Sequence, residues 1–175
     1  IIGGGPSGST AAEALAKKGF RVALIDRAGR IKPCGGAVPP RLIKDFDIPE
    51  SQIVAKITTA RMISPTARKV DIPIENGYVG MVDRENFDEF LRTRAKAAGA
   101  HRFTGTFLRV LRNSDKNSVA VVFKEKNSLK EITLKTKLII GADGARSNVA
   151  RAEVPGGKTI PYVIAYHEII EAPKN

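Results

Sequence analysis

The order of apolar and polar positions along the chain is typical of an α/β protein. Ile1-Ile2 ends an apolar strand, and a glycine-rich turn follows it directly. Residues 9–18 then have the periodicity of a helix, and Gly19 stands where a helix-ending glycine is expected. Residues 21–25 predict a second apolar strand. A strand, a glycine turn, a helix and a second strand in this order predict a Rossmann-like unit with a parallel sheet.

The middle of the chain predicts several shorter elements. Residues 28–40 are rich in Gly and Pro and predict a loop, and residues 41–46 predict a short helix after it. Residues 59–64 and 69–74 alternate between apolar and polar side chains, which predicts a pair of strands. Residues 78–82 predict one further short strand.

A longer helix and a meander of strands are predicted next. Asp83 is placed to cap a helix over residues 84–98, and Gly99 ends that helix. The apolar face of the helix consists of Phe87, Leu91, Ala95 and Ala98. Three strands of an antiparallel meander are predicted at 103–111, 118–123 and 132–134, with a turn at 113–117.

The last part of the chain predicts two more strands. Residues 137–140 predict a continuous apolar strand of the kind found in the buried middle of a parallel sheet. Residues 161–170 predict a strand that begins a second layer. The predicted fold class is therefore α/β, with a Rossmann-like dinucleotide-binding domain that combines a parallel sheet and an antiparallel β-meander.

Composition and charge narrow the possible partners. The 175 residues are 42% hydrophobic and 27% charged, which is ordinary for a globular domain, and no apolar run approaches the roughly 20 residues that span a bilayer. The net charge of +11 comes from 29 Lys and Arg against 18 Asp and Glu. These basic residues are scattered and no aromatic residues are interleaved with them, so nucleic-acid binding is not predicted. An anionic membrane face or a diphosphate-bearing ligand is a better match for this positive charge than nucleic acid is.

Two further features concern the chain as a whole. It has no initiator Met and begins two residues before the glycine turn, so a fragment of a longer enzyme is expected. The single cysteine, Cys34, excludes an internal disulfide and fits a reducing compartment.

The glycine turn carries the first chemical motif. Gly3, Gly5 and Gly8 fill the three glycine positions of G-x-G-x-x-G. The first permits a tight turn, the second lets the backbone approach a pyrophosphate, and the third lets the helix pack closely on the sheet. The helix N-terminus then directs N–H groups and the positive end of its dipole at the phosphates. Asp26, at the end of the second strand, is placed to accept hydrogen bonds from a ribose.

A second motif follows the apolar strand at 137–140. Residues 141–147 read Gly-Ala-Asp-Gly-Ala-Arg-Ser and lead into a short helix over 147–151. Asp143 therefore lies at the carboxyl end of a strand, where open α/β sheets bind their ligands. An Asp at this place equally fits a purely structural turn with a helix cap, and the motif taken alone leaves both interpretations open.

The two motifs together resemble the flavoprotein superfamily that includes p-hydroxybenzoate hydroxylase, whose second motif contacts FAD and the nicotinamide cofactor. Within it, residues 26–39 (Asp-Arg-Ala-Gly-Arg-Ile-Lys-Pro-Cys-Gly-Gly-Ala-Val-Pro) are similar to the geranylgeranyl reductase family, in the branch that reduces chlorophyll tails. Residues 60–66, 78–88 and 163–170 match that branch as well, and 112–135 match it least. A third family motif, Gly-Asp, is expected beyond residue 175.

This resemblance implies a set of cofactor-binding residues. The pyrophosphate of FAD is expected at Gly3, Gly5, Pro6, Ser7 and Gly8. The adenosine ribose is expected at Asp26 beside Arg27, and the acid disfavours a 2′-phosphate there, which favours FAD over NADP as the resident nucleotide. The remaining implied contacts are Cys34, Gly35, Gly36 and Ala37 near the flavin, Arg84 at the phosphates or ribose, the backbone of Leu108 near the adenine, and Asp143 with Gly144 in the second motif.

Simpler explanations compete with two of these assignments. Cys34 is interpreted as a small residue without a redox role, as buried cysteines often are. Arg84 could be a surface residue, but a cation at a helix N-terminus opposes the helix dipole, which favours a functional reason for it. No catalytic residue and no metal ligand is assigned.

The resemblance also implies domains and a reaction. Residues 1–160 are expected to form an FAD-binding domain that lacks its C-terminal segment, and 161–175 to begin a substrate-binding β-layer. The implied activity is NADPH-driven, FAD-mediated reduction of the geranylgeranyl tail of a (bacterio)chlorophyllide, or of geranylgeranyl diphosphate, to phytyl. The enzyme is expected at a membrane surface: the cytoplasmic face of a bacterial photosynthetic membrane, or the plastid in a plant or alga. Two alternatives stay open: an FAD-dependent monooxygenase of aromatics or quinone precursors, and a cofactor-binding module without activity.

Overall fold

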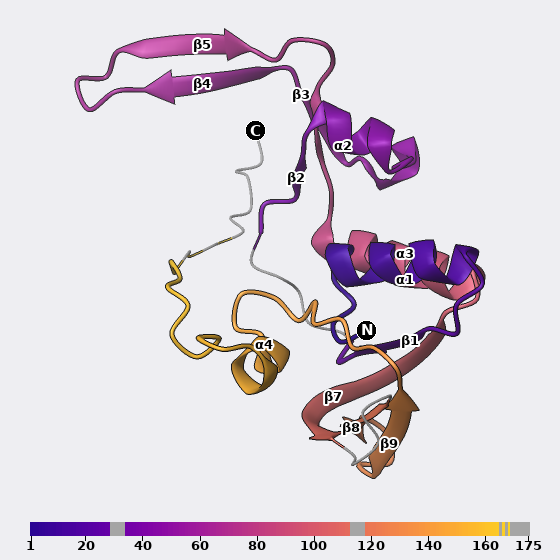
Figure 1. The fold of residues 1–175 in the computed structure, drawn as a ribbon. Helices are drawn as coiled ribbons and strands as arrows, with labels where there is room; N and C mark the ends of the chain where they lie inside the picture. Colours follow the sequence, from indigo (N-terminus) through magenta and orange to yellow (C-terminus); the bar gives the residue numbers. More distant parts are fainter. Residues whose placement is uncertain (29–33, 113–117, 165, 167, 169–175) are drawn as a thin grey trace. The chain divides into compact units, whose positions relative to one another are not determined.

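The computed structural model describes residues 1–28, 34–112, 118–164, 166 and 168 (Figure 1). The chain divides into two compact units, the first formed by residues 1–30 with 88–164 and the second by residues 31–87 with 165–175. Both parallel and antiparallel strand pairs occur beside helices, so the predicted α/β class is confirmed. Within the described ranges, no helix combines the length and the apolarity needed to cross a bilayer.

The first unit contains a mixed four-stranded sheet. Its strands are β1 (Ala23–Asp26), β7 (His101–Arg112), β8 (Val119–Glu125) and β9 (Glu131–Thr136), in the order β1-β7-β8-β9. β7 pairs with β1 in parallel and with β8 antiparallel, so a single long strand links the Rossmann-like part to the meander. Ile2 extends the parallel part through bridges to Ile25 and Gly141. The predicted meander is confirmed, while its turn at 113–117 lies outside the described residues.

Helices cover the sheet of the first unit because its strands alternate their apolar side chains. Leu24 packs with Ala12 of α1 (Pro6–Lys17) and Ala95 of α3 (Arg84–Ala97), whereas its neighbour Ile25 packs with Phe123 and Val149 on the other face. Successive residues of a strand point to opposite faces, so this alternation separates two cores. α1 and α3 lie side by side along the strands (Figure 1). A short helix, α4 (Asn148–Glu153), contributes Val149 to the second core.

Glycines end the two long helices as predicted. Gly19 follows α1 with φ +81°, and Gly99 follows α3 with φ +106°. Both values lie in the left-handed region that favours glycine at a helix end. Asp83 begins α3, with its Oδ1 accepting the N–H of Glu85 at 3.0 Å, so the predicted cap is confirmed.

The second unit holds a small sheet, a hairpin and short helices. The sheet has the order β2-β6-β3, with β2 (Ala37–Val38), β6 (Val79–Met81) and β3 (Ala55–Ile57). The hairpin pairs β4 (Thr59–Ile63) with β5 (Lys69–Pro73), and both predicted strands are confirmed. The short helices are α2 (Pro40–Asp45) and the 3₁₀ turn η1 (Glu50–Gln52).

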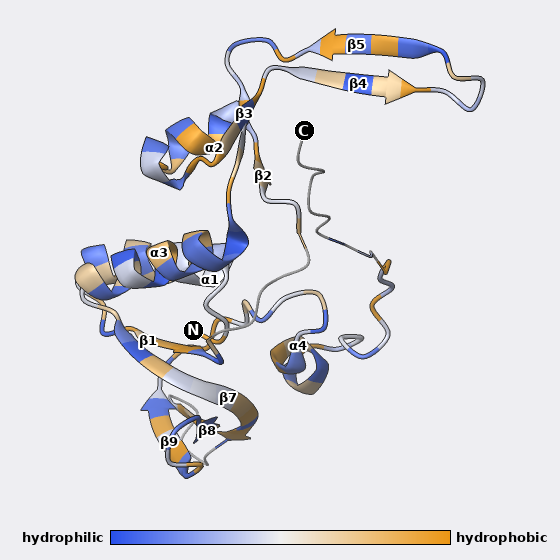
Figure 2. Cartoon of the chain, turned by 180° about the vertical axis from the view of Figure 1, so that it is seen from behind, coloured by the Kyte–Doolittle hydropathy of each residue, from blue (hydrophilic) through white to orange (hydrophobic). Residues whose placement is uncertain are grey.

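The hairpin is amphipathic. The pairs Ala60↔Ile72 and Met62↔Val70 lie on one face, and Arg61↔Asp71 lies on the other, where Arg61 Nε donates to Asp71 Oδ1 at 2.6 Å. Figure 2 shows the resulting alternation of hydrophobic and hydrophilic residues along β5, while β4 ends on two hydrophobic residues.

Some sequence predictions differ from the structure. The segment 137–140 forms no regular strand and is not buried, since it joins Ile2 only through the Ile2 N to Ile140 O and Ala142 N to Ile2 O hydrogen bonds, and Leu138 is 72% exposed. It lies at the edge of this sheet and not in its middle, because no strand among the described residues pairs with its other side. The loop predicted over 28–40 contains β2, and β3 was not predicted.

The strand predicted over 161–170 is also absent where residues are described. Residues 161–164, 166 and 168 are in no strand, and the other positions lie outside the described residues. Val163 is 93% exposed and Ile164 89%. Their apolar pattern predicted a strand, but a strand forms only against a hydrogen-bonding neighbour, and the described chain supplies none here.

Candidate nucleotide-binding site

Two glycines of the first motif are required by the fold itself. A methyl group on Gly3, whose φ is +102°, would lie 2.3 Å from the carbonyl oxygen of Ala142. A methyl group on Gly8 would lie 1.9 Å from the carbonyl oxygen of Gly3. Any larger residue at either position must displace backbone. The predicted reasons for the first and third glycines, a tight turn and close helix packing, are thus visible as contacts within the chain.

Gly5 differs from both. A methyl group there would meet no atom within 4 Å. Its φ of −75° and ψ of −176° are open to any residue, so neither the backbone nor a neighbouring group requires a glycine. Gly5 caps α1, and Pro6 follows as the first helical residue, where its missing N–H costs nothing. The space at Gly5, beside the first N–H groups of the helix, fits the close approach of a pyrophosphate.

The structure brings the two motifs together although about 140 residues separate them. A methyl group on Gly3 would lie 2.8 Å from Cα of Asp143, and Ala142 N donates to Ile2 O at 2.7 Å. The carboxylate of Asp143 accepts the N–H of Asn148 at 2.7 Å and a hydrogen bond from the Ser147 hydroxyl. Asp143 therefore holds the N-terminus of α4, which confirms a structural role for this acid, while the N-cap residue itself is Ser147. Contact of Asp143 and exposed Gly144 with a cofactor stays a prediction.

Asp26 lies at the end of β1 next to the glycine turn. Its Oδ2 accepts the N–H of Gly4 at 2.8 Å, and its Oδ1 accepts the N–H of Ala28 at 2.9 Å. The side chain is 21% exposed, and each carboxylate oxygen keeps acceptor capacity beyond one bond. The geometry leaves room for the predicted ribose contact and gives Asp26 a second role in holding the turn. Its neighbour Arg27 is exposed.

Leu108 lies at an irregularity of β7. The register with β8 shifts between Phe107 and Arg109, so Leu108 is the extra residue of a β-bulge. A bulge leaves backbone groups out of the ladder and directs them elsewhere. This is the local feature that a backbone contact to an adenine would use, although the contact itself stays a prediction.

The residues expected near the flavin and Arg84 belong to the second unit. A methyl group on Gly36, whose φ is +78°, would lie 2.0 Å from the carbonyl oxygen of Val82, and Val82 N donates to Gly36 O at 2.9 Å. A methyl group on Gly35 would meet no atom within 4 Å. Cys34 and Ala37 are exposed, so the interpretation of Cys34 as a buried residue is wrong, and Arg84 is half-buried in the first turn of α3.

Sequence reasoning missed the charged residues that support the turn. Arg92 is 8% exposed and donates from Nη1 to the carbonyl oxygen of Gly4 at 3.1 Å. Buried Ser9 donates from its hydroxyl to the same oxygen, also at 3.1 Å. No local pattern marks Arg92, because it lies beside the apolar face of α3 in a helix that carries several other arginines.

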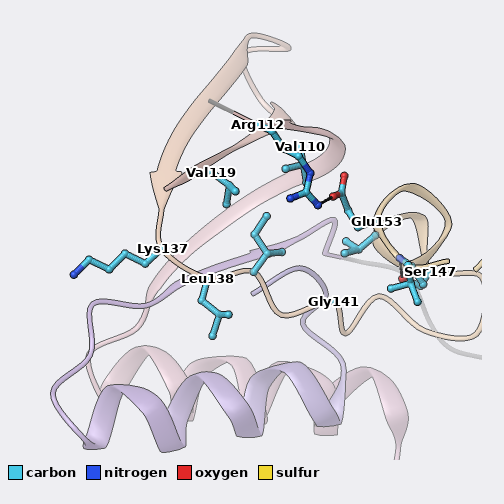
Figure 3. Close-up of a pocket in the computed structure, with 12 residues that line it drawn as sticks. Val110, Arg112, Val119, Lys137, Leu138, Gly141, Ser147 and Glu153 are labelled. Atoms are coloured by element: carbon cyan, nitrogen blue, oxygen red, sulfur yellow. Dashed lines mark hydrogen bonds and ion pairs between the residues drawn. The ribbon is translucent and has the colours of Figure 1, made fainter. Parts of the chain in front are cut away.

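A separate pocket of roughly 340 Å³ lies between the meander and α4 (Figure 3). Its lining is mainly apolar, with Val110, Leu138 and Val149 among its residues. An ion pair between Arg112 and Glu153 lies at its side. It shares Gly141 and Ser147 with the second motif but includes none of the glycines of the first.

The charge network around Arg92 leads to a prediction about acid stability. Glu89 pairs with Arg102 and Arg92, and the hydrogen bond from Arg102, the largest cause, lowers the pKa of Glu89 to about 2 from 4.5. Because the folded pKa is depressed, this stabilisation is complete above about pH 4.5 and is lost as the pH falls towards about 2. The side chain is half exposed, so screening reduces the contribution to about 1 kcal/mol.

We expect Glu89→Gln to lower the free energy of unfolding by about that amount near pH 7, and the difference from the parent protein to shrink on acidification. Urea unfolding at several pH values measures this. Glu131→Gln, which removes an exposed pair with Arg109, is the control and should have a smaller effect. An equal loss for Glu89→Gln at every pH would contradict the prediction.

Comparison with known proteins places this geometry in a family. An "NAD(P)-binding Rossmann-like domain" model matches residues 1–45, and an "FAD binding domain" model matches residues 48–160. The chain belongs to the FAD-binding domain family. The predicted cofactor classes, FAD and a nicotinamide nucleotide, are confirmed at the level of these two domain models.

Individual relatives narrow the resemblance. The chain is 64% identical over 173 residues to geranylgeranyl diphosphate reductase of Rhodobacter capsulatus, an alignment that covers 99% of this chain and 43% of the relative. It is 39% identical to the chloroplastic geranylgeranyl diphosphate reductase of Oryza sativa, over 99% of this chain and 39% of the relative. The resemblance to geranylgeranyl reductases predicted from the sequence is thereby confirmed. The chain spans about two fifths of the length of these relatives.

Solved structures agree with this assignment. A geranylgeranyl bacteriochlorophyll reductase-like protein from Thermoplasma acidophilum has a TM-score of 0.71 and 28% identity, covering 82% of this chain and 38% of that chain. A flavin-dependent brominase has a TM-score of 0.74 and 23% identity, covering 88% of this chain and 39% of that chain. At this identity, the similarity establishes a shared fold and nothing about function.

Proposed function

We propose that this chain is the nucleotide-binding part of a geranylgeranyl reductase that uses NADPH and FAD to saturate the geranylgeranyl tail of a (bacterio)chlorophyllide or of geranylgeranyl diphosphate. The observation that carries the proposal is the 64% identity to the Rhodobacter capsulatus reductase over 99% of this chain. The open space at Gly5 beside the N-terminus of α1 supports it, because a pyrophosphate needs such a place.

The residues of the chain have distinct parts in this proposal. The N-terminus of α1 binds the pyrophosphate through N–H groups and the helix dipole, with Gly5 leaving room for it. Asp26 binds the adenosine ribose, and the bulge at Leu108 presents backbone to the adenine. Gly35 lets the loop around it approach the flavin. When bound and reduced by NADPH, FAD would supply the hydride for the alkene. The protein positions the alkene and excludes water.

A membrane surface is the proposed place of action. The substrate tail is an isoprenoid, and the net charge of +11 favours an anionic surface. Several plant relatives carry chloroplastic in their names, and one bacterial relative comes from Rhodobacter capsulatus. We place the enzyme at the cytoplasmic face of a bacterial photosynthetic membrane, or in the plastid for a plant or algal source.

The alternatives are less favoured. The brominase shares only the fold, whereas the relatives with the higher identities are geranylgeranyl diphosphate reductases. A monooxygenase or halogenase reaction therefore has no observation that specifically supports it.

The test uses the full-length protein loaded with FAD. Under anaerobic conditions, NADPH is expected to bleach the flavin, and geranylgeranylated chlorophyllide or bacteriochlorophyllide, or geranylgeranyl diphosphate, is expected to restore its colour. Chromatography should then show dihydro, tetrahydro and hexahydro products in sequence. Comparison of the pigment and diphosphate substrates identifies the head group. Oxygen insertion into an aromatic substrate, with no saturated tail, would establish the monooxygenase instead.

A further inference from the structure

We propose that Arg92 is a positioning residue for nucleotide binding, which orients the backbone N–H of Gly5 toward the pyrophosphate of the dinucleotide. This inference rests on the proposed FAD site and adds a residue from α3 to it. The peptide bond between Gly4 and Gly5 provides the backbone of the middle glycine position.

Both sides of Gly4 are held by hydrogen bonds. Its N–H donates to Asp26 Oδ2 at 2.8 Å. Its carbonyl oxygen accepts from Arg92 Nη1 and from Ser9 Oγ, each at 3.1 Å. A methyl group on Gly4 would lie 2.8 Å from Cβ of Asp26 and 3.0 Å from Cδ of Arg92, so these side chains pack directly on the turn.

The hydrogen bonds to this carbonyl determine the direction of the next N–H. A trans peptide group is planar, and its C=O and N–H point in opposite directions. Since the carbonyl of Gly4 points to Arg92 and Ser9, the N–H of Gly5 points away from them. An added methyl group on Gly5 would meet no atom within 4 Å. This open space beside Gly5 is the one proposed for the pyrophosphate.

Arg92 itself is held in place. Its Nη1 lies 3.5 Å from Asp26 Oδ1, and its Nη2 lies 3.0 Å from Glu89 Oε2. Glu89 is in turn bound by Arg102 from β7, at 2.5 and 2.8 Å. The Arg92 side chain is 10% exposed. Its guanidinium donates a hydrogen bond to the turn and forms ion pairs with Asp26 and Glu89 at the same time. A lysine has a single donor centre on a flexible stem and cannot make all of these contacts together.

A second arginine of α3, Arg94, reaches α1 and offers a matched control. Arg94 Nε donates to Glu13 Oε2 at 2.7 Å, and its side chain is 22% exposed. Arg92 and Arg94 therefore both form partly buried ion pairs from the same helix. Of these two arginines, Arg92 donates to the carbonyl oxygen of Gly4 in the glycine turn, whereas Arg94 donates to Glu13 of α1.

The experiment measures affinity and stability separately in the full-length protein after removal of FAD. Arg92→Met, Arg92→Lys, Ser9→Ala and Arg94→Met are titrated with FAD and with ADP, which carries the adenosine and diphosphate only, and the Tm of each apoprotein is recorded. Loss of a charge-assisted hydrogen bond predicts a fall of about tenfold or more in both affinities for Arg92→Met. Arg92→Lys should recover part of the loss, and Ser9→Ala should show a smaller loss in the same direction.

Arg94→Met should lower the Tm of the apoprotein like Arg92→Met but keep the ADP affinity. If Arg92→Met does not fold, Arg92→Lys and Ser9→Ala still report on the same carbonyl. Unchanged ADP affinity in those variants, or equal losses in Arg94→Met, would overturn the role of Arg92. A parent protein that binds neither FAD nor ADP would instead overturn the proposed function.

Discussion

Gly8→Ala is expected to prevent folding of the first unit, whereas Gly5→Val is expected to leave it folded and to abolish FAD binding. The added methyl group at Gly8 would lie 1.9 Å from the carbonyl oxygen of Gly3, in a buried turn that cannot move without breaking the bridge of Ile2 to the sheet. We expect a loss of more than about 4 kcal/mol, in the range reserved for severe steric conflicts.

A Cβ at position 5 has no protein atom within 4 Å and the backbone angles there are ordinary, so we expect Gly5→Val to act on the bound ligand and not on the fold. Purification yield and circular dichroism report the fold, and the flavin absorbance of the purified full-length protein reports FAD. Gly19→Ala serves as a control for strain, because its φ is +81° but nothing lies within 4 Å. Gly19→Ala should lower the free energy of unfolding by only about 1–2 kcal/mol. A yellow Gly5→Val protein with its full flavin content would show that this turn does not bind FAD.

Gly36→Ala is expected to destabilise the second unit strongly, and Gly35→Val to spare it while weakening flavin binding. The methyl group on Gly36 would lie 2.0 Å from the carbonyl oxygen of Val82, at a φ of +78° that already disfavours alanine. The contact closes the segment onto the chain after β6 through the Val82 to Gly36 hydrogen bond. A cost above about 3 kcal/mol is expected from the clash and the strain together.

Gly35 is exposed and open, so a larger side chain there is tolerated by the chain and is predicted to intrude on the flavin. Thermal unfolding of the apoprotein separates the two variants, and the visible circular dichroism of bound flavin reports its surroundings. Gly156→Ala, at φ +75° with no atom within 4 Å, controls for positive φ alone. Equal stability of Gly36→Ala and the parent protein would contradict the steric explanation, and an unchanged flavin spectrum in Gly35→Val would contradict the placement of this loop.

Local patterns predicted most elements because their causes are local. Gly19 and Gly99 end helices where they were expected, and Asp83 caps α3, because these positions depend on backbone angles and on neighbours within one turn. The strand predicted over 161–170 is absent at its described positions for the opposite reason, since a strand needs a partner that the pattern does not contain. The 137–140 segment has an apolar pattern but lies at a sheet edge, where no described strand covers it.

By itself, the sequence determined the nucleotide-binding type of fold, the family resemblance and the two motifs, because glycine spacing and strand-end acids are readable one residue at a time. Only the tertiary structure separated Gly3 and Gly8, which the chain needs for its own packing, from Gly5, which it does not. It also brought Asp143 beside Gly3, where its carboxylate accepts the first N–H of α4, and it placed Arg92 on the carbonyl of Gly4. The contacts of Gly3 with Asp143 and of Arg92 with Gly4 join residues that lie about 90 to 140 positions apart, and no local pattern encodes which distant group fills the space beside a given atom.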